Sequence, residues 1–213
     1  MGSNTLNLTL SDALWNPLYR QATWVNIIYM FFHEVAGINV IYQYSSQIYI
    51  DMKAKNPRLG TIILGIDAIV FGFTSIIVIR KLKRKTIFIG GHIGVGISWL
   101  LVAYFNYVGN SLGIIIGMNM FMLFYINSSG PLAWTYAAET CVDAAIGIVI
   151  MCIYVNVIYL AIICPIILAY NPNYVFIGMS LLSFVGAVFC WIYMKETKGL
   201  TDKEKKEIYR KKI

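Results

Sequence analysis

Several hydrogen-bonding side chains interrupt an otherwise hydrophobic stretch of the chain. Residues 24–50 include His33, Glu34 and Asn39. The stretch is nevertheless long enough to cross a bilayer as a helix, for which roughly 20 residues suffice. Ionisable and amide groups are costly in lipid, so they must face protein or a water-filled cavity. Gly37 weakens the helix between them and lets a ligand approach the backbone closely. This pattern favours a site for a neutral, hydroxyl-rich solute.

A second interruption is the Gly130-Pro131 pair inside another hydrophobic stretch. Proline removes a backbone hydrogen bond, and we expect it to unwind or kink the helix. Irregular backbone at membrane depth is tolerated where it lines a cavity, and such helices mark transporter substrate sites. Trp134 follows the pair, and its ring face suits stacking against a sugar. The alternative is that Pro131 is a packing kink and Trp134 an ordinary aromatic residue.

Composition places these stretches in a membrane protein. The 213 residues are 59% hydrophobic and 13% charged, whereas soluble domains carry about 25% charged residues. We therefore predict an all-α polytopic protein with six transmembrane helices. The hydrophobic spans lie at approximately 24–50, 59–79, 86–105, 112–137, 146–170 and 174–194.

The basic residues predict the orientation in the membrane. Six spans return the chain to the side on which it began. Arg20, the Arg80–Lys85 cluster and the tail hold all but three of the 17 lysines and arginines, and the exceptions are Lys53, Lys55 and Arg58. Because positive charge accumulates on the cytoplasmic side, we expect a multi-pass protein with both termini cytoplasmic, in the plasma membrane. The same distribution indicates a membrane surface as partner and no nucleic acid.

These features divide the chain into three parts. Residues 1–22 form a polar lead-in, residues 23–195 the six-helix transmembrane bundle, and residues 196–213 a basic cytoplasmic tail. Thr201 and Glu204 have the spacing of a capping box, which predicts a short helix over residues 201–212. Gly199 is the predicted end of the helix before it.

Other chemistry finds little support in the sequence. The four cysteines lie in or beside apolar runs without metal-ligand spacing, and we interpret them as small core residues. We find no nucleophile–base pair and no phosphate-binding glycine loop. We therefore expect no enzyme activity, no metal and no cofactor.

Four segments, in this order, resemble the sugar porters of the major facilitator superfamily. They are Asn16–Gln21, Gly37–Asn39 followed by Tyr44-Ser45, Gly130–Trp134 followed by Glu139, and Glu196–Gly199. The resemblance runs from about Leu14 to Lys198 and covers only the family's C-terminal half, its seventh to twelfth helices. It implies a six-helix C-terminal bundle, with the lead-in matching the end of the interdomain linker.

The resemblance also implies a set of sugar contacts. Asn39 matches a hydroxyl ligand, while His33 and Glu34 occupy the places of two glutamines in the family. Asn127 and Asn156 lie within one position of sugar contacts on the tenth and eleventh helices. The alternative is that His33 and Glu34 only satisfy each other or neighbouring helices.

Gating and coupling roles follow from the same resemblance. Tyr44 matches an extracellular gating tyrosine, and Gly130-Pro131 matches the break of the tenth helix. Glu34 and Asp67 are the candidates for a coupled proton, because burial raises the pKa of a carboxyl group and permits it to cycle. Asp67 is one position away from the place of an eighth-helix asparagine.

The cytoplasmic gate departs from the family pattern. Two arginines that normally follow Glu139 are replaced by Ala144 and Ile146. In the family they pair with acidic groups and lock the gate in the outward-facing state. Glu139 therefore needs another partner, for which Lys81 and Arg84 are the candidates, and we expect a leaky inside gate or altered conformational control.

Together these features predict transport of a hexose such as glucose by alternating access. A lone bundle would expose polar groups to lipid, so a second six-helix bundle is expected. It would be a missing N-terminal half, a second copy or another chain. Two alternatives remain open: a sugar-binding or regulatory membrane subunit that does not transport, and an inactive truncated remnant.

Overall fold

The computed structural model describes residues 8–51 and 57–210, and within these ranges every regular element is an α-helix. The predicted all-α class is therefore confirmed. The helices are α1 (Leu10–Trp15), α2 (Arg20–Val35), α3 (Ile38–Asp51), α4 (Pro57–Lys81), α5 (Arg84–Tyr107), α6 (Ser111–Ile126), α7 (Ser129–Thr140), α8 (Asp143–Tyr170), α9 (Pro172–Tyr193) and α10 (Asp202–Glu207).

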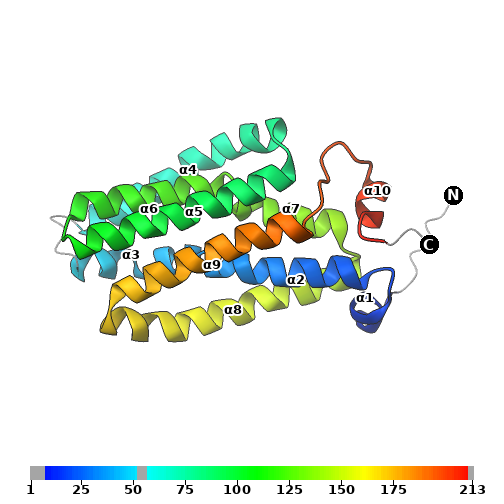
Figure 1. Cartoon of the computed structure of the whole chain (residues 1–213), viewed down its shortest axis with the longest axis horizontal. Helices are drawn as coiled ribbons and strands as arrows, with labels where there is room; N and C mark the ends of the chain where they lie inside the picture. The colour runs from blue at the N-terminus through cyan, green and yellow to red at the C-terminus, as the bar shows by residue number, and fades with distance from the viewer. Residues whose placement is uncertain (1–7, 52–56, 211–213) are drawn as a thin grey trace.

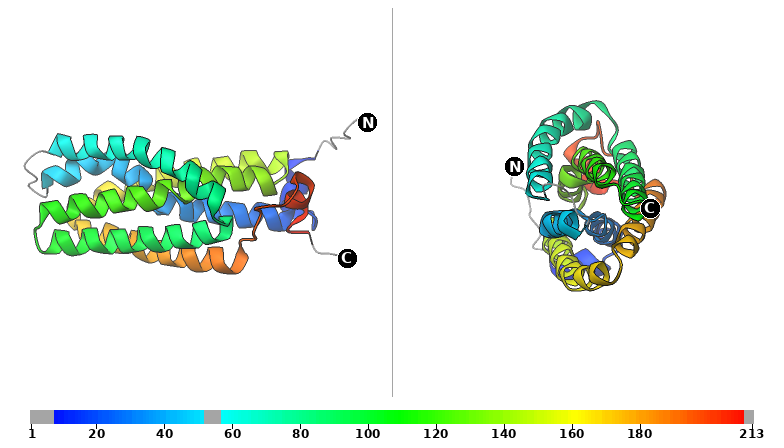
Figure 2. Two further views of the ribbon diagram at one scale, coloured as in Figure 1. Left: turned by 90° about the horizontal axis from the view of Figure 1, so that it is seen from above. Right: turned by 90° about the vertical axis from the view of Figure 1, so that its left-hand side faces the viewer.

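The described residues contain six helical spans that are long and apolar enough to cross a membrane, as the sequence predicted. Figures 1 and 2 show them running side by side along one long axis. Four spans are single helices, whereas the first consists of α2 and α3 and the fourth of α6 and α7. The two divided spans are the ones that carry the polar interruptions.

The spans differ in how much of their surface the bundle covers. The apolar window of the α2–α3 span is 72% buried and that of α5 is 61% buried, but α4 is 11% and α8 only 17% buried. Helix α5 packs between α6 and α9, and α2 packs on α8 and α9. Because α4 and α8 leave most of their apolar side chains uncovered, they form the outer faces of the bundle.

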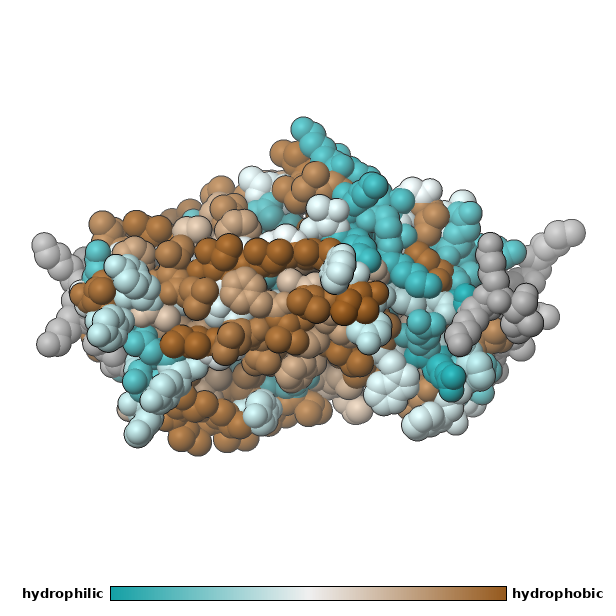
Figure 3. Space-filling view, viewed as in Figure 1, coloured by the Kyte–Doolittle hydropathy of each residue, from teal (hydrophilic) through white to brown (hydrophobic). Residues whose placement is uncertain are grey.

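Polar residues gather at one end of the bundle. Helices α1 and α10 and the α4–α5 and α7–α8 turns lie at this end, which we call the α10 end (Figure 1). Figure 3 shows a band of hydrophobic side chains over the long face and hydrophilic side chains toward the α10 end. Lys53 and Lys55, which contribute to the predicted charge asymmetry, lie outside the described residues.

The end of the last span differs from the prediction. Helix α9 ends at Tyr193, and Met194 already has an extended backbone, so the prediction that Gly199 ends this helix was wrong. The reason is that the backbone of Lys195 is held outside the helix, where its N–H and its carbonyl both bond the Tyr136 hydroxyl at 3.0 Å. Gly199 lies in the following loop with a φ of +85°.

The first span breaks at Gly37, which joins α2 to α3. Gly37 has a φ of +104°, a left-handed conformation that favours glycine. The Trp99 indole N–H on α5 donates a 2.7 Å hydrogen bond to the Ala36 carbonyl, which the break has freed. A Cβ at position 37 would lie 2.7 Å from both the Trp99 ring and the Met179 sulfur. The break is therefore fixed by tryptophan packing as well as by glycine.

Substituting Gly37 is expected to destabilise the bundle. In Gly37→Ala, the added methyl must displace Trp99 while the backbone keeps an unfavourable φ, at a cost of about 1–3 kcal/mol. The measurement is the thermal unfolding of the detergent-solubilised chain. Gly147→Ala on α8 is the matched control, because no atom lies within 4 Å of its added Cβ. Equal melting temperatures for the two variants would contradict the prediction.

Candidate functional site

The fourth span breaks beside the first one. Helix α6 ends at Ile126, and Ser128 has an irregular backbone with φ −133° and ψ −100°. Side chains of the break satisfy carbonyls of α6: the Ser128 hydroxyl bonds Phe124 O at 2.5 Å, and the Asn127 amide bonds Leu123 O at 2.9 Å. The Ser128 hydroxyl replaces the backbone partner that Phe124 O loses at the break, whereas Leu123 O also keeps the backbone N–H of Asn127 at 3.2 Å.

Pro131 occupies the first turn of α7 and does not itself break a helix. The sequence predicted the interruption at Gly130-Pro131, but the helix is interrupted at residues 127–128, and the irregular backbone is that of Ser128. At the third position of a helix, the N–H that proline lacks would have no partner within the helix in any case. The span is discontinuous as predicted, and its break lies a few residues earlier.

A polar cluster joins the two breaks. The Asn39 amide on α3 donates a 2.5 Å hydrogen bond to Oε2 of Glu34 on α2, across the Gly37 break. The Tyr125 hydroxyl on α6 lies 3.0 Å from His33 Nε2, and this nitrogen is 3.8 Å from Glu34 Oε1. His33 and Glu34 are both only 3% exposed. The cluster therefore contains an amide, a carboxyl, an imidazole and a phenol at membrane depth.

Trp134 on α7 lies next to this cluster and is partly exposed. Its ring lies edge-on to the His33 ring, with 6.4 Å between the centroids, and the residue is 43% exposed. Asn39 is itself only partly buried. An aromatic ring and an amide around one polar cluster are a common combination for binding a sugar, because the ring covers the C–H groups while the amide bonds hydroxyls.

The other predicted sugar contacts lie apart from this cluster. The amide oxygen of Asn127, in the α6–α7 break, accepts a 2.8 Å hydrogen bond from Thr74 on α4. Asn156 on α8 donates to Cys152 O at 2.7 Å and lines a hollow together with Ile28 and Phe31 of α2. Asn127 thus links two helices, whereas Asn156 borders the α2–α8 groove.

Tyr44 and Asp67 also take positions of their own. The Tyr44 hydroxyl donates to Ala161 O at 3.1 Å, which ties α3 to α8. On α4, Oδ2 of Asp67 is buried without a hydrogen-bond partner among the described residues, and so is the nearby Tyr49 hydroxyl on α3. Of the two carboxyl groups predicted to couple a proton, Glu34 thus belongs to the polar cluster and Asp67 lies outside it.

Tyr125 was missed by the sequence analysis. One tyrosine among many in apolar spans carries no signal, and only the packing of α6 against α2 brings its hydroxyl to His33. Its ring also stacks on Phe121, with 5.5 Å between the centroids.

The predicted gate carboxylate lies at the α10 end. Glu139 on α7 receives two hydrogen bonds from the Arg84 guanidinium on α5, at 2.8 and 3.1 Å, and one from the Thr197 hydroxyl at 2.7 Å. Of the two cations suggested by the sequence, Arg84 is thus the partner. Glu196 accepts bonds from the backbone N–H groups of Arg84 and Lys85, which begin α5.

Comparison with known proteins identifies the family. Residues 3–209 match the family described as "Sugar (and other) transporter". The chain belongs to this sugar transporter family. Among its relatives are Hexose transporter 1 of Plasmodium yoelii yoelii and the facilitated glucose transporter member 2 of solute carrier family 2 from Gallus gallus, each 27% identical over 203 residues. These alignments cover 91% of this chain but only 40% and 38% of the relatives.

Solved sugar transporter structures share the fold. A double-tryptophan mutant of XylE superposes with a TM-score of 0.82 at 20% identity, over 91% of this chain and 44% of the other. An inward-open structure of the Escherichia coli xylose transporter XylE gives a TM-score of 0.74 over 88% of this chain. The chain thus has the fold of half a major facilitator transporter and spans less than half the length of these sugar transporters.

Removing the Tyr125 hydroxyl is expected to loosen the cluster. Tyr125→Phe leaves the buried His33 ring without this hydrogen bond, at a cost of about 1 kcal/mol. The measurement is the melting temperature of the purified chain in detergent, which should be lower for Tyr125→Phe than for the parent chain. Tyr159→Phe is the control, because this tyrosine is exposed on α8. Indistinguishable melting temperatures for the two variants would mean that His33 does not depend on Tyr125.

Proposed function

We propose that this chain is the C-terminal bundle of a hexose transporter, which moves a glucose-like sugar by alternating access together with a second six-helix bundle. The sugar would bind at the polar cluster where the two broken spans meet. The α10 end would face the cytoplasm of a cell whose plasma membrane holds the protein.

The observation that carries this proposal is the hydrogen-bonded contact between the two breaks. His33 belongs to the first broken span and Tyr125 to the second, and their side chains meet at 3.0 Å. Discontinuous helices at membrane depth are typical of transporter substrate sites. Asn39 contacts the cluster at Glu34 and Trp134 contacts it at His33, and an amide and an aromatic face suit a sugar ring. Membership of the sugar transporter family supports the same substrate class.

The need for a second bundle follows from the uncovered faces. Alternating access requires two bodies that rock about a central site. Asn39, Trp134 and the polar side of α3 are partly exposed in this bundle, and a second bundle would enclose the sugar against them. Its source would be an N-terminal half, a second copy of this chain or another protein.

The first experiment is counterflow of labelled glucose in proteoliposomes, with this chain alone and with the N-terminal six-helix half of a related hexose transporter. Uptake that unlabelled sugar competes away, in either preparation, is the expected result. Its absence from folded, correctly inserted protein in both preparations would contradict transport. Sugar-dependent stabilisation without uptake would instead favour a binding or regulatory subunit. The absence of both uptake and stabilisation would indicate an inactive remnant.

Within a transporting assembly, Asn39→Ala is expected to weaken sugar binding. The variant removes an amide that can bond one or two sugar hydroxyls, so the affinity should fall by about 1 kcal/mol or more, roughly fivefold. The measurement is the sugar concentration that half-saturates counterflow. Asn106→Ala is the control, since its amide bonds Asn173 where α5 ends and α9 begins, outside the polar cluster. Unchanged affinity with normal expression would remove Asn39 from the site.

A further inference from the structure

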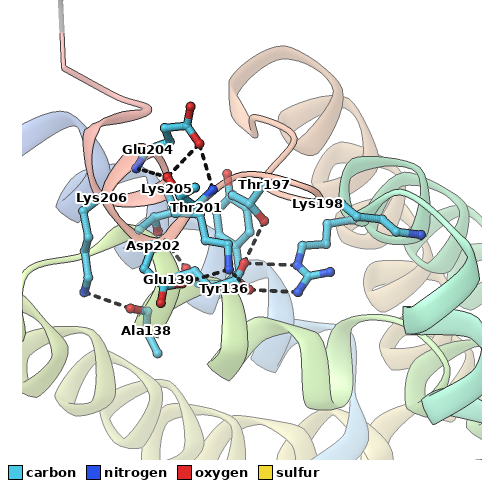
Figure 4. A network of polar contacts seen from close by, with 12 residues as sticks. Tyr136, Ala138, Glu139, Thr197, Lys198, Thr201, Asp202, Glu204, Lys205 and Lys206 are labelled. Atoms are coloured by element: carbon cyan, nitrogen blue, oxygen red, sulfur yellow. Dashed lines mark hydrogen bonds and ion pairs between the residues drawn. The ribbon is translucent and has the colours of Figure 1, made fainter.

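The tail that follows the last span folds back onto the bundle. Helix α10 begins with a complete capping box, in which the Thr201 side chain and the Glu204 side chain each bond the other's backbone N–H. Figure 4 shows α10 at the end of α7, with Lys205 and Lys206 directed toward that helix. The predicted helix over residues 201–212 is thus confirmed in place, although it ends at Glu207, and residues 211–212 lie outside the described residues.

Lys205 reaches the predicted gate carboxylate. Its ammonium lies 3.3 Å from Oε1 of Glu139, the same oxygen that Arg84 contacts at 2.8 Å. The side chains of Lys205 and Glu139 are only 17% and 13% exposed. Desolvation lowers the pKa of Lys205, but hydrogen bonds to Glu139 and Asp202 outweigh it and raise this pKa above its usual value. Glu139 therefore has two cationic partners, one from α5 and one from the tail.

Lys206 binds the end of the same helix. Its ammonium donates to the carbonyls of Ala138, at 2.9 Å, and Cys141 (Figure 4 draws the first of these). Asp143 lies 3.9 Å away. The last carbonyls of a helix lack partners within the helix and carry partial negative charge, so an ammonium there is favourable. The tail thus neutralises both the carboxylate and the C-terminal carbonyls of α7.

Tyr209 anchors the tail in the bundle. It is 3% exposed, and its hydroxyl lies 2.7 Å from that of Tyr136 on α7. The same hydroxyl donates to Tyr193 O at the end of α9, at 3.1 Å. Lys195 lies over the Tyr209 ring, 5.1 Å from its centroid. This buried anchor holds the α10 lysines at the end of α7, unlike a solvated tail.

We propose that Lys205 is a positioning residue of the gate, which supplies from the tail the positive charge absent at Ala144 and Ile146. The proposal rests on the transport function proposed above. Lys205 and Arg84 hold the Glu139 carboxylate from opposite elements, so α5, α7 and the tail move as one body when access changes sides. The tail is thereby part of the transport machinery.

Cys141 offers a readout that does not require transport. Cys141 is fully buried: its thiol donates to Ala22 O on α2 at 3.7 Å, and Lys206 of the tail bonds its carbonyl. Burial raises the pKa of the thiol to about 11, which makes it unreactive. In a chain whose other three cysteines are replaced by alanine, Lys205→Met should release the tail. Labelling of Cys141 by a maleimide in open membrane fragments should then accelerate about fivefold, as expected from the loss of one partly buried ion pair.

Three further variants separate this role from general destabilisation. Lys203→Met removes an exposed lysine of the same helix and should label at the parent rate. Lys205→Arg keeps the charge and should restore slow labelling. In a Glu139→Gln background, Lys205→Met should add no further acceleration, because the two residues act through one contact. Equal labelling of the Lys205→Met and Lys203→Met chains would overturn the proposal.

Sugar flux completes the test where the assembly transports. Lys205→Met should change the maximal counterflow rate while the half-saturating sugar concentration stays constant, because Lys205 lies away from the sugar site. A change confined to the half-saturating concentration would overturn the gate assignment. Absence of flux in the parent protein would contradict the proposed function alone, and the labelling comparison would still decide the role of Lys205.

Discussion

The hydrogen bond from the Trp99 indole to the Ala36 carbonyl is the interaction on which the polar region depends. A helix that breaks inside a membrane leaves carbonyl groups unpaired, and lipid offers them no partner. Trp99 provides one from α5 and fills the space beside Gly37 with its ring. The break turns the chain so that Asn39 can reach back to Glu34. One aromatic side chain thus permits the irregular backbone and, through it, the polar contact.

The polar cluster and the α10 end stabilise their ionisable groups in different ways. At membrane depth, Glu34 and His33 have neutral hydrogen-bonding partners, Asn39 and Tyr125, whose geometry depends on the two breaks. At the α10 end, Glu139 is surrounded by cations from separate parts of the chain. Neutral partners leave room for a hydroxyl-rich ligand to replace them, whereas paired charges near water can rearrange without a large desolvation cost.

The spans could be predicted from hydrophobic length, and Gly37 could be recognised as a weak point of the first helix, because both are local properties of the chain. The division of that helix into α2 and α3 was not predicted, because it depends on the packing of Trp99. The α6–α7 break was placed too late, since proline is conspicuous in a sequence although it fits the first turn of a helix. Tyr125 and Lys205 could not be identified, because only tertiary packing brings a tyrosine from α6 to His33 and a tail lysine to Glu139. Features that depend on neighbouring residues could be predicted from the sequence, but side-chain contacts between residues far apart in the sequence could not.

The uneven burial of the spans has a consequence for how the chain enters the membrane. The α4 and α8 spans have mean hydropathies of 2.5 and 2.6 and little buried surface, whereas the α2–α3 span has 1.3 and is 72% buried. A strongly apolar segment can partition from the translocon into lipid by itself, but one that carries His33 and Glu34 inserts poorly alone. Among the described spans, the α2–α3 span is therefore the one that most needs its neighbours along the chain. Stable insertion of its polar face is expected to await α6, which carries the Tyr125 hydroxyl that bonds His33.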